Sequence, residues 1–188
     1  MRNWKLFSLI GLAACGCNSR TASYLPLNLG SEWTYEVNGR LRNSVEEMRV
    51  TGRTSVEGVP GFVITGALGS SRMAWKGSTL IASELAGISY SPAIVLADFN
   101  SPQAAREWRG QVRAYGLTHQ ATDALTHTEE TFALSGRKLP AIAAQHRLKF
   151  GNVTIATKIT FVQGLGIASL DEHRDGQFLG SIQYLAGP

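Results

Sequence analysis

Apolar and polar side chains alternate through residues 142–161, on either side of Gly151-Asn152, and this pattern constrains the fold more than any other feature of the sequence. A period of two is typical of a β-strand with one buried face. Glycine in the first central position of a two-residue connection is typical of a type II′ turn. Pairing outward from the turn sets Phe150 opposite Val153, so the segment predicts an antiparallel hairpin.

The register of this hairpin sorts its side chains into a buried face and an exposed face. Leu148 and Phe150 are expected to point into the core, and Arg147 and Lys149 into water. A slip by one residue would bury the two charges in place of the two apolar side chains. The alternation therefore fixes the register.

Two more turn signals occur elsewhere in the chain. Asp175-Gly176 predicts a closing hairpin. Four apolar side chains are expected on one face of that region: Ile167, Phe178, Ile182 and Tyr184. Asn38-Gly39 follows a run of alternating aromatic residues, but the alternation breaks around Glu46-Glu47, where we expect a bulge or a longer loop.

The remaining pattern completes an all-β prediction. Further strands are expected at residues 61–66, 72–76, 80–83, 106–115 and 126–134. Residues 101–109 are the best helix candidate, with Pro102 near the start, but a strand through Trp108 competes with it. We expect one antiparallel, strongly curved sheet or an incompletely closed barrel of about ten strands, with at most one or two short helices. A two-sheet β-sandwich is the alternative.

The amino-terminal residues 1–14 have the layout of a secretory signal. Arg2 and Lys5 precede an apolar stretch over residues 6–14, which ends in small residues. The stretch is shorter than the roughly 18 to 20 residues that cross a hydrocarbon core, so a retained transmembrane helix is the weaker interpretation. We expect export and removal of this segment.

Leu12-Ala13-Ala14-Cys15 resembles the lipobox of bacterial lipoproteins, in which the cysteine is acylated and becomes the new amino terminus. This resemblance predicts that Cys15 carries the lipid. Two or three acyl chains, palmitate among them, hold a protein on a bilayer where one would bind marginally. Cys17 is the competing site, with Ala14 where the motif usually has a bulky aliphatic residue. An ordinary cleaved signal with two stray cysteines is the alternative.

The expected organisation is a signal (residues 1–14), a lipidated flexible tether (15–23) and one β-rich periplasmic domain (24–188). Gly16 in place of an aspartate resembles the pattern of lipoproteins sent to the outer membrane of diderm bacteria. Arg2 and Lys5 supply two of the four units of net positive charge. The domain itself therefore carries little net charge, and we expect no nucleic-acid partner.

Tyr24-Leu25-Pro26-Leu27, followed by Gly30, Trp33 and Tyr35, resembles the opening of an uncharacterised family of bacterial lipoproteins. Their mature domains begin with Tyr-aromatic-Pro-Leu, a glycine and Trp-Thr-Tyr. Residues 139–141 and 161–167 resemble that family's turn before a hairpin and its closing glycine-rich strand. Leu25 and residues 137–141 depart from the pattern. The resemblance implies an envelope lipoprotein and carries no catalytic residues across.

Candidate ligand-facing residues are His146 and three tryptophans, Trp33, Trp75 and Trp108. His146 lies on the apolar hairpin face, where a buried imidazole needs a partner. We expect a backbone carbonyl or Thr157 to satisfy it, with a ligand cavity as the alternative. The tryptophans could line a cleft, but such side chains more often fill a β core.

No motif for a nucleotide, a cofactor or a catalytic nucleophile is present. Residues 164–166 begin like a dinucleotide loop, but Ser169 replaces the third glycine and no helix pattern follows. The acidic residues around Glu172 and Asp175 are more typical of a solvated hairpin tip than of a metal site. We therefore expect no catalytic residues, no metal and no cofactor.

These observations favour a membrane-anchored, non-enzymatic envelope protein that binds a hydrophobic ligand or a partner segment, as a chaperone-like module does. An open apolar concavity in the domain would support this hypothesis. A structural or accessory subunit of an envelope complex is the alternative, which an exposed flat apolar patch would support. A hydrolase ranks third, and a carboxylate beside His146 in an open pocket would favour it.

Overall fold

A computed structural model describes residues 24–40, 43–66, 69–101 and 104–187. The predicted signal, tether and lipidated Cys15 lie outside these residues. The strands are β1 (Glu32–Gly39), β2 (Asn43–Val56), β3 (Val59–Gly66), β4 (Gly69–Lys76), β5 (Thr79–Leu85), β6 (Ile88–Asp98), β7 (Arg106–Ala114), β8 (Leu117–Leu134), β9 (Arg137–Phe150), β10 (Val153–Val162), β11 (Gly166–Arg174) and β12 (Gln177–Ala186). No α-helix occurs in the described residues, and none of them forms a helix that could span a membrane.

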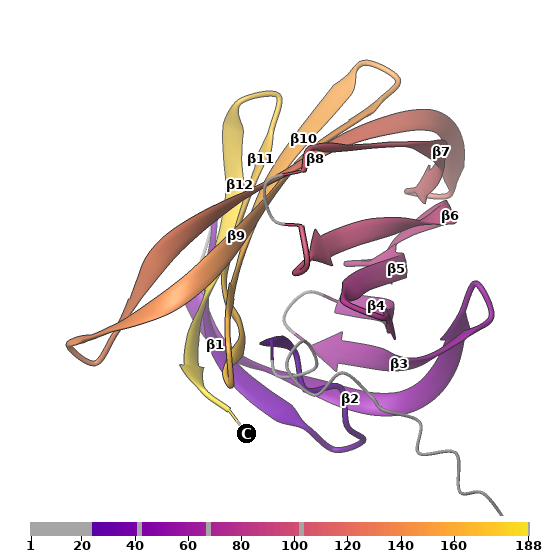
Figure 1. The fold of residues 1–188 in the computed structure, drawn as a ribbon. Coiled ribbons are helices and arrows are strands. Elements are labelled where there is room, and N and C mark those ends of the chain that lie inside the picture. Colours follow the sequence, from indigo (N-terminus) through magenta and orange to yellow (C-terminus); the bar gives the residue numbers. More distant parts are fainter. Residues whose placement is uncertain (1–23, 41–42, 67–68, 102–103, 188) are drawn as a thin grey trace, which may run out of the picture.

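The twelve strands form one closed antiparallel barrel in which each strand pairs with the next along the chain (Figure 1). β12 returns to pair with β1, from Thr34 opposite Ala186 to Gly39 opposite Gly180. The all-β antiparallel class is therefore confirmed. The expected ten strands, the incomplete closure and the alternative sandwich are wrong. Closure depends on a pairing between the two ends of the domain, for which no local turn signal exists.

The hairpin of β9 and β10 has the register that its alternation predicts. Phe150 pairs with Val153, and the pairing continues without a break to Ala141 opposite Val162. Gly151 has a φ of 54° while Asn152 has no positive φ, as a type II′ turn requires. Leu148 is buried and Arg147 is exposed, so the faces are as expected.

The closing hairpin differs from the prediction at Phe178. Ile167, Ile182 and Tyr184 are buried, but Phe178 is 41% exposed. A β-bulge is the cause: Glu172 pairs with Gly180 while His173 pairs with Phe178, which leaves an extra residue in β12. An extra residue reverses the alternation, so Phe178 lies on the outside, with its ring against His173.

The first hairpin and the candidate helix also need correction. Asn38 pairs with Asn43, so the connection is longer than the Asn38-Gly39 pair alone. The strand is regular at Glu46-Glu47, and the bulge of β2 lies further on, between Val50 and Gly52. The last part of residues 101–109 belongs to β7 from Arg106 onward, which confirms the strand interpretation there. Residues 102–103 are outside the described part.

Aromatic side chains fill the interior near the first strand. Trp33 and Tyr35 of β1 have no exposed surface. The Trp33 indole Nε1 donates to the Leu165 carbonyl at 2.9 Å, and the Tyr35 hydroxyl donates to the Ile167 carbonyl at 2.9 Å. Both polar tips are thus satisfied by β11 and the turn before it, so the rings can be buried without loss of hydrogen bonds.

Candidate functional site

A buried histidine–aspartate pair lies inside the barrel, at the position that the sequence marks as a polar interruption. His146 Nδ1 is 2.8 Å from Asp123 Oδ2, and His146 Nε2 is 3.0 Å from the carbonyl oxygen of Leu96. The two side chains are 7% and 1% exposed. The expected backbone carbonyl is therefore present, and Asp123 of β8 is a second partner that the sequence analysis does not name.

The geometry of the pair leaves His146 no free nitrogen. Both ring nitrogens face acceptors, so Nε2 donates to Leu96 and one further proton is shared between Nδ1 and Asp123. A general base needs a nitrogen that can take a proton from a substrate. His146 therefore orders the interior, and its ring is not available to a substrate in this arrangement.

The space beside this pair is small. A pocket beside the pair measures about 30 Å³, which is room for about one water molecule. Tyr90, Glu172 and Thr157 line it together with the His146–Asp123 pair. Burial raises the pKa of Tyr90, which the charges of Asp123 and Glu172 raise further, and burial also raises the pKa of Glu172. The pocket beside the pair is thus polar and too small for an acyl chain.

One seam of the barrel is closed mainly by side chains. Within the described residues, β6 and β7 pair over three positions only, from Ser89 opposite Arg113 to Ser91 opposite Gln111. Pro92 follows, and proline has no N–H to donate to a neighbouring strand. The indole Nε1 of Trp108 donates to the Pro92 carbonyl at 3.1 Å. Side-chain bonds therefore replace the backbone ladder here.

Two histidines of the barrel interior, His127 and His146, form hydrogen bonds with the main chain of β6 at this seam. His146 bonds to the Leu96 carbonyl, and His127 Nε2 accepts the Asp98 amide at 3.1 Å. The Arg106 guanidinium forms an ion pair with the Asp98 carboxylate. Burial lowers the pKa of His127, nearby His146 and Arg106 lower it further, and Asp98 opposes the shift. The neutral form of His127 is the one that can accept the amide.

The three tryptophans of the sequence prediction do not converge. Trp33 lies in the core and Trp108 lies at the β6–β7 seam. Trp75 donates its indole N–H to the Leu25 carbonyl at 3.1 Å and packs on Phe99. Each indole thus has its own backbone acceptor. A ligand-facing role for these residues and for His146 stays a prediction.

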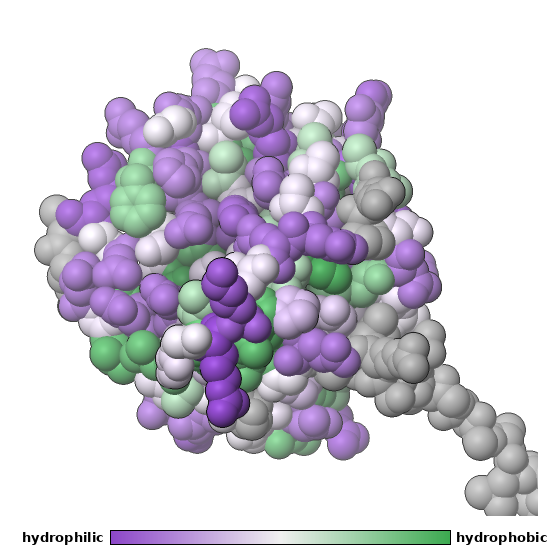
Figure 2. All heavy atoms as spheres, turned by 60° about the vertical axis from the view of Figure 1, so that its left-hand side comes forward, coloured by the Kyte–Doolittle hydropathy of each residue, from purple (hydrophilic) through white to green (hydrophobic). Residues whose placement is uncertain are grey.

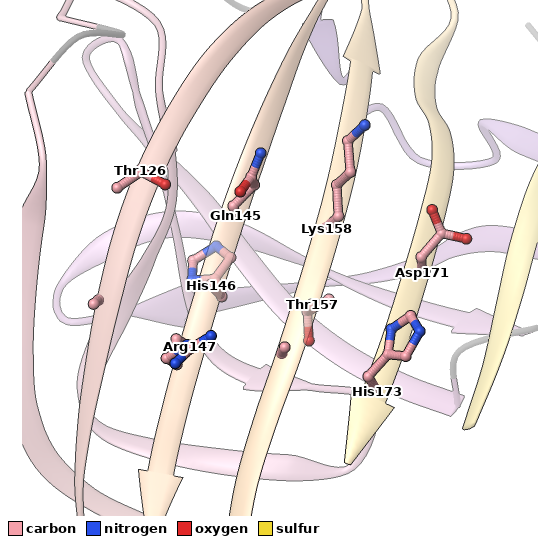
Figure 3. A pocket seen from close by; sticks show the side chains of 10 residues that line it. Thr126, Gln145, His146, Arg147, Thr157, Lys158, Asp171 and His173 are labelled. Carbon is pink, nitrogen blue, oxygen red and sulfur yellow. The ribbon is translucent and has the colours of Figure 1, made fainter. Parts of the chain in front are cut away.

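A hollow of about 490 Å³ lies on the outer face of β8, β9, β10 and β11 (Figure 3). Its polar side chains come from four neighbouring strands, with Gln145, Lys158 and Asp171 side by side across three of them. Hydrophilic side chains dominate this side of the molecule, with apolar surface visible between them in Figure 2. We call this hollow the outer groove.

Small side chains create the outer groove. Arg147 of β9 pairs with Ala124 on β8 and with Ala156 on β10, so a long side chain stands between two short ones. Thr126 continues the same pattern on β8. A trough consequently runs on each side of the β9 ridge.

One end of the outer groove is closed by hydrogen bonds that join β8 to β10 across the outer face of β9. Glu130 of β8 accepts hydrogen bonds from Lys158 at 2.7 Å and from Thr160 at 2.8 Å, both on β10. Beyond it, the far part of the β8–β9 hairpin packs on the outside of β10 and β11 through Phe132 and Leu139. The hairpin therefore bends over its own sheet, which hollows the face between its tip and Arg147.

A smaller hollow of about 210 Å³ adjoins the groove and shares Arg147 and Ala124 with it. Arg109 and Lys149 also line this second hollow. Among the described residues, no carboxylate forms an ion pair with Arg147 or Lys149, and Arg109 has only a distant, exposed one with Glu107 at 3.7 Å. The face is thus positively charged at its open end.

The outer groove is absent from the sequence prediction, although one signal for it exists. Ala124 and Thr126 occupy exposed positions of β8, and Ala156 is half-buried on the same face of β10. Recognition of the groove requires the register of three strands at once. In the described residues, no group of three His, Cys, Asp or Glu side chains is arranged to hold a metal ion.

Comparison with known proteins gives structural neighbours only. No family model and no curated protein matches the sequence. A candidate lipoprotein from Parabacteroides distasonis has a TM-score of 0.53 at 8% identity, over 88% of this chain and 98% of its own. A candidate exported protein with a YmcC-like fold from Bacteroides fragilis has a TM-score of 0.51 at 9% identity, over 87% and 98%. The chain therefore shares the fold of these two proteins. At this identity the likeness concerns the fold alone.

Proposed function

We propose that this chain is a lipid-anchored, non-enzymatic binding module of the cell envelope, which holds a partner segment in the outer groove. The observation that carries the proposal is the contrast between a pocket of about 30 Å³ beside the His146–Asp123 pair and an outer groove of about 490 Å³. Small-molecule sites in proteins typically occupy about 300 to 1,000 Å³, a range that the groove reaches and the inner pocket does not.

The contrast also favours one of the two kinds of partner expected from the sequence. A hydrophobic ligand would need an open apolar concavity, whereas the inward face is filled by residues such as Trp33, Tyr35 and Phe161. The outer groove combines charged and polar side chains with apolar surface between them, as a peptide site does. The proposal therefore retains the partner segment and abandons the buried hydrophobic ligand.

The location in the envelope rests on the amino-terminal residues. The signal-like residues 1–14 and the lipobox resemblance at Cys15 support export and acylation, and Gly16 supports the outer membrane with the domain in the periplasm. Two proteins that share the fold are described as a lipoprotein and an exported protein, which agrees with this location.

The non-enzymatic part of the proposal rests on His146. Its contact with Asp123 would favour an enzyme if the pair lay in an open pocket. Both ring nitrogens are hydrogen-bonded, however, and the adjoining pocket has room for only about one water molecule. Within the described residues, no hydroxyl or thiol is placed on the ring as a nucleophile would be.

Site-specific photo-cross-linking in the producing bacterium tests the binding site. A benzophenone amino acid replaces Thr126, in the groove, or Ser55, an exposed residue of β2 away from it. We expect one discrete adduct from position 126 and none from position 55. Arg147→Glu should abolish the adduct, whereas Arg53→Glu, on β2, should leave it unchanged. Equal adducts from both positions, no adduct from position 126, or indifference to Arg147→Glu would overturn the proposal.

A further inference from the structure

We infer that the segment held in the outer groove is an extended acidic peptide that lies along β9, with carboxylates at alternate positions. This inference rests on the function proposed above and adds the chemistry of the partner. It follows from the outward side chains of β9, from the small residues beside them, and from the charges that this face leaves without partners.

The outward side chains of β9 form a regular row. Gln145, Arg147 and Lys149 are exposed and stand two residues apart. Alternate residues of a strand repeat at about 6.6 to 6.8 Å. The row therefore presents one amide and two positive charges at a spacing that a second extended chain can match with its own alternate residues.

The neighbouring strands leave room beside this row. Lys149 pairs with Thr122 on β8 and with Thr154 on β10, so it has a short side chain on each side, as Arg147 does. A peptide lying in the trough can bring its carboxylates to the two charges without displacing a bulky residue. Arg147 belongs to both hollows and so lies at the centre of this surface.

The two positive charges of the row, on Arg147 and Lys149, form no ion pair within the described residues. Lys158 on β10 is paired with Glu130, but no carboxylate lies within ion-pair distance of Arg147 or Lys149 in the residues described. A guanidinium binds a carboxylate through two parallel hydrogen bonds, which gives direction as well as attraction. Charge complementarity therefore favours an acidic partner.

The closed barrel determines how such a peptide is held. Each strand of the barrel has a neighbour on both sides, so the peptide meets the face of β9 and not an open edge along it. Recognition must then come from side chains, and spacing becomes the basis of specificity. A chain with the same number of carboxylates, none of them two residues apart, cannot place them at both Arg147 and Lys149 along the row.

Binding of synthetic peptides to the full acylated chain in detergent micelles tests the inference. Fluorescence anisotropy would compare four Asp-Ser repeats with two Asp-Asp-Ser-Ser repeats, which have the same number of carboxylates but none two residues apart, and with four Lys-Ser repeats. We expect the alternating acidic peptide to bind at least tenfold more tightly than the Asp-Asp-Ser-Ser peptide, and the basic peptide not to bind. The binding should weaken as salt concentration rises.

Matched variants locate the site. Arg147→Glu and Lys149→Glu should each weaken binding of the alternating peptide at least tenfold, while Arg53→Glu on β2 should not change it. Circular dichroism checks that each variant is folded, and the milder Arg147→Gln replaces any that is not. Equal affinity for the two acidic peptides, binding that survives Arg147→Glu, or no binding of either acidic peptide would overturn the inference.

The outcomes separate this inference from the proposed function. If the adduct from position 126 forms and depends on Arg147 but neither acidic peptide binds, the groove is the binding site and its partner is not an acidic peptide. If dextran sulfate binds but the acidic peptides do not, the inference of an acidic peptide is wrong, and the ligand class is an anionic polysaccharide. Loss of both the adduct and the peptide binding would overturn both proposals.

Discussion

The main-chain amide of Asp98 donates to Nε2 of His127 across 3.1 Å and thereby ties β6 to β8. The bond lies at the seam where β6 has separated from β7, so a side chain supplies an acceptor that no neighbouring strand offers. It requires Nε2 without a proton. Protonated His127 would present an N–H to an N–H, and the bond would be lost.

Acid should therefore weaken the fold at this seam. Burial lowers the pKa of His127 below its ordinary value of about 6.5, so the unfolded chain binds a proton more readily than the folded chain. The contribution of His127 to the unfolding free energy is fully present above a pH of about 6.5. This contribution is lost as the pH falls through the folded-state pKa of His127. Urea denaturation at pH 7.5 and pH 5.0 measures the loss.

His127→Gln is the matched control for this pH dependence, because its amide oxygen can accept the same bond and does not titrate. The variant should lose less unfolding free energy than the wild type between the two pH values. An identical loss in both proteins would mean that His127 does not carry the effect.

Trp33 should behave as a core residue. It has no exposed surface and its indole nitrogen is bonded to Leu165, so Trp33→Ala should lower the unfolding free energy by about 3 to 5 kcal/mol. Leu117→Ala, at a residue that is 62% exposed, should change it by less than about 0.5 kcal/mol. A Trp33→Ala protein of unchanged stability that has lost partner binding would favour the ligand-facing interpretation.

The β9–β10 turn should tolerate substitution unequally. Gly151 has a φ of 54°, and the nearest atom to an added Cβ is His119 Nδ1 at 3.9 Å. The cost of Gly151→Val is therefore backbone strain and not a clash, about 1 to 2 kcal/mol. Asn152→Val should cost less. Thermal denaturation compares the two, and a larger loss at Asn152 would contradict the type II′ turn.

Membrane attachment should depend on one cysteine. Cys15→Ala should move the protein from the membrane fraction to the soluble fraction, because the acyl chains are expected on Cys15. Cys17→Ala should leave the partition as it was. Fractionation with detection by immunoblot measures both. Membrane association that persists after Cys15→Ala would remove the basis for lipid anchoring.

Turn residues and alternation in the sequence predicted the features that depend on residues close together in the chain. The register of the β9–β10 hairpin follows from its turn and its alternation, and the inward position of His146 follows from that register. Its contact with Asp123 depends on the β8–β9 register, and its contact with Leu96 depends on β6, a strand that the pattern did not reveal. Pro92 interrupts that strand, and Ile94–Ala97 is continuously apolar, so no alternation marks it.

Bulges and long-range closure account for the other differences. One extra residue in β12 turned Phe178 outward, and no periodicity argument can anticipate where such a residue falls. The outer groove depends on how far the β8–β9 hairpin bends, which its own sequence does not specify. Phe132 and Leu139 of the hairpin pack against Val162 and Ala168, residues that are distant from them in sequence.

The central claim is that a partner covers the outer face of β9, and a lysine footprint tests it most directly. Isolated envelopes and the purified chain would be treated with the same amine-acylating reagent, and modification at each lysine compared by mass spectrometry. Lys149 on β9 and Lys76 at the end of β4 are both exposed in the isolated domain. We predict that Lys149 is protected in envelopes and that Lys76 reacts equally in both samples. Equal modification of Lys149 in envelopes and in the purified chain would contradict the claim.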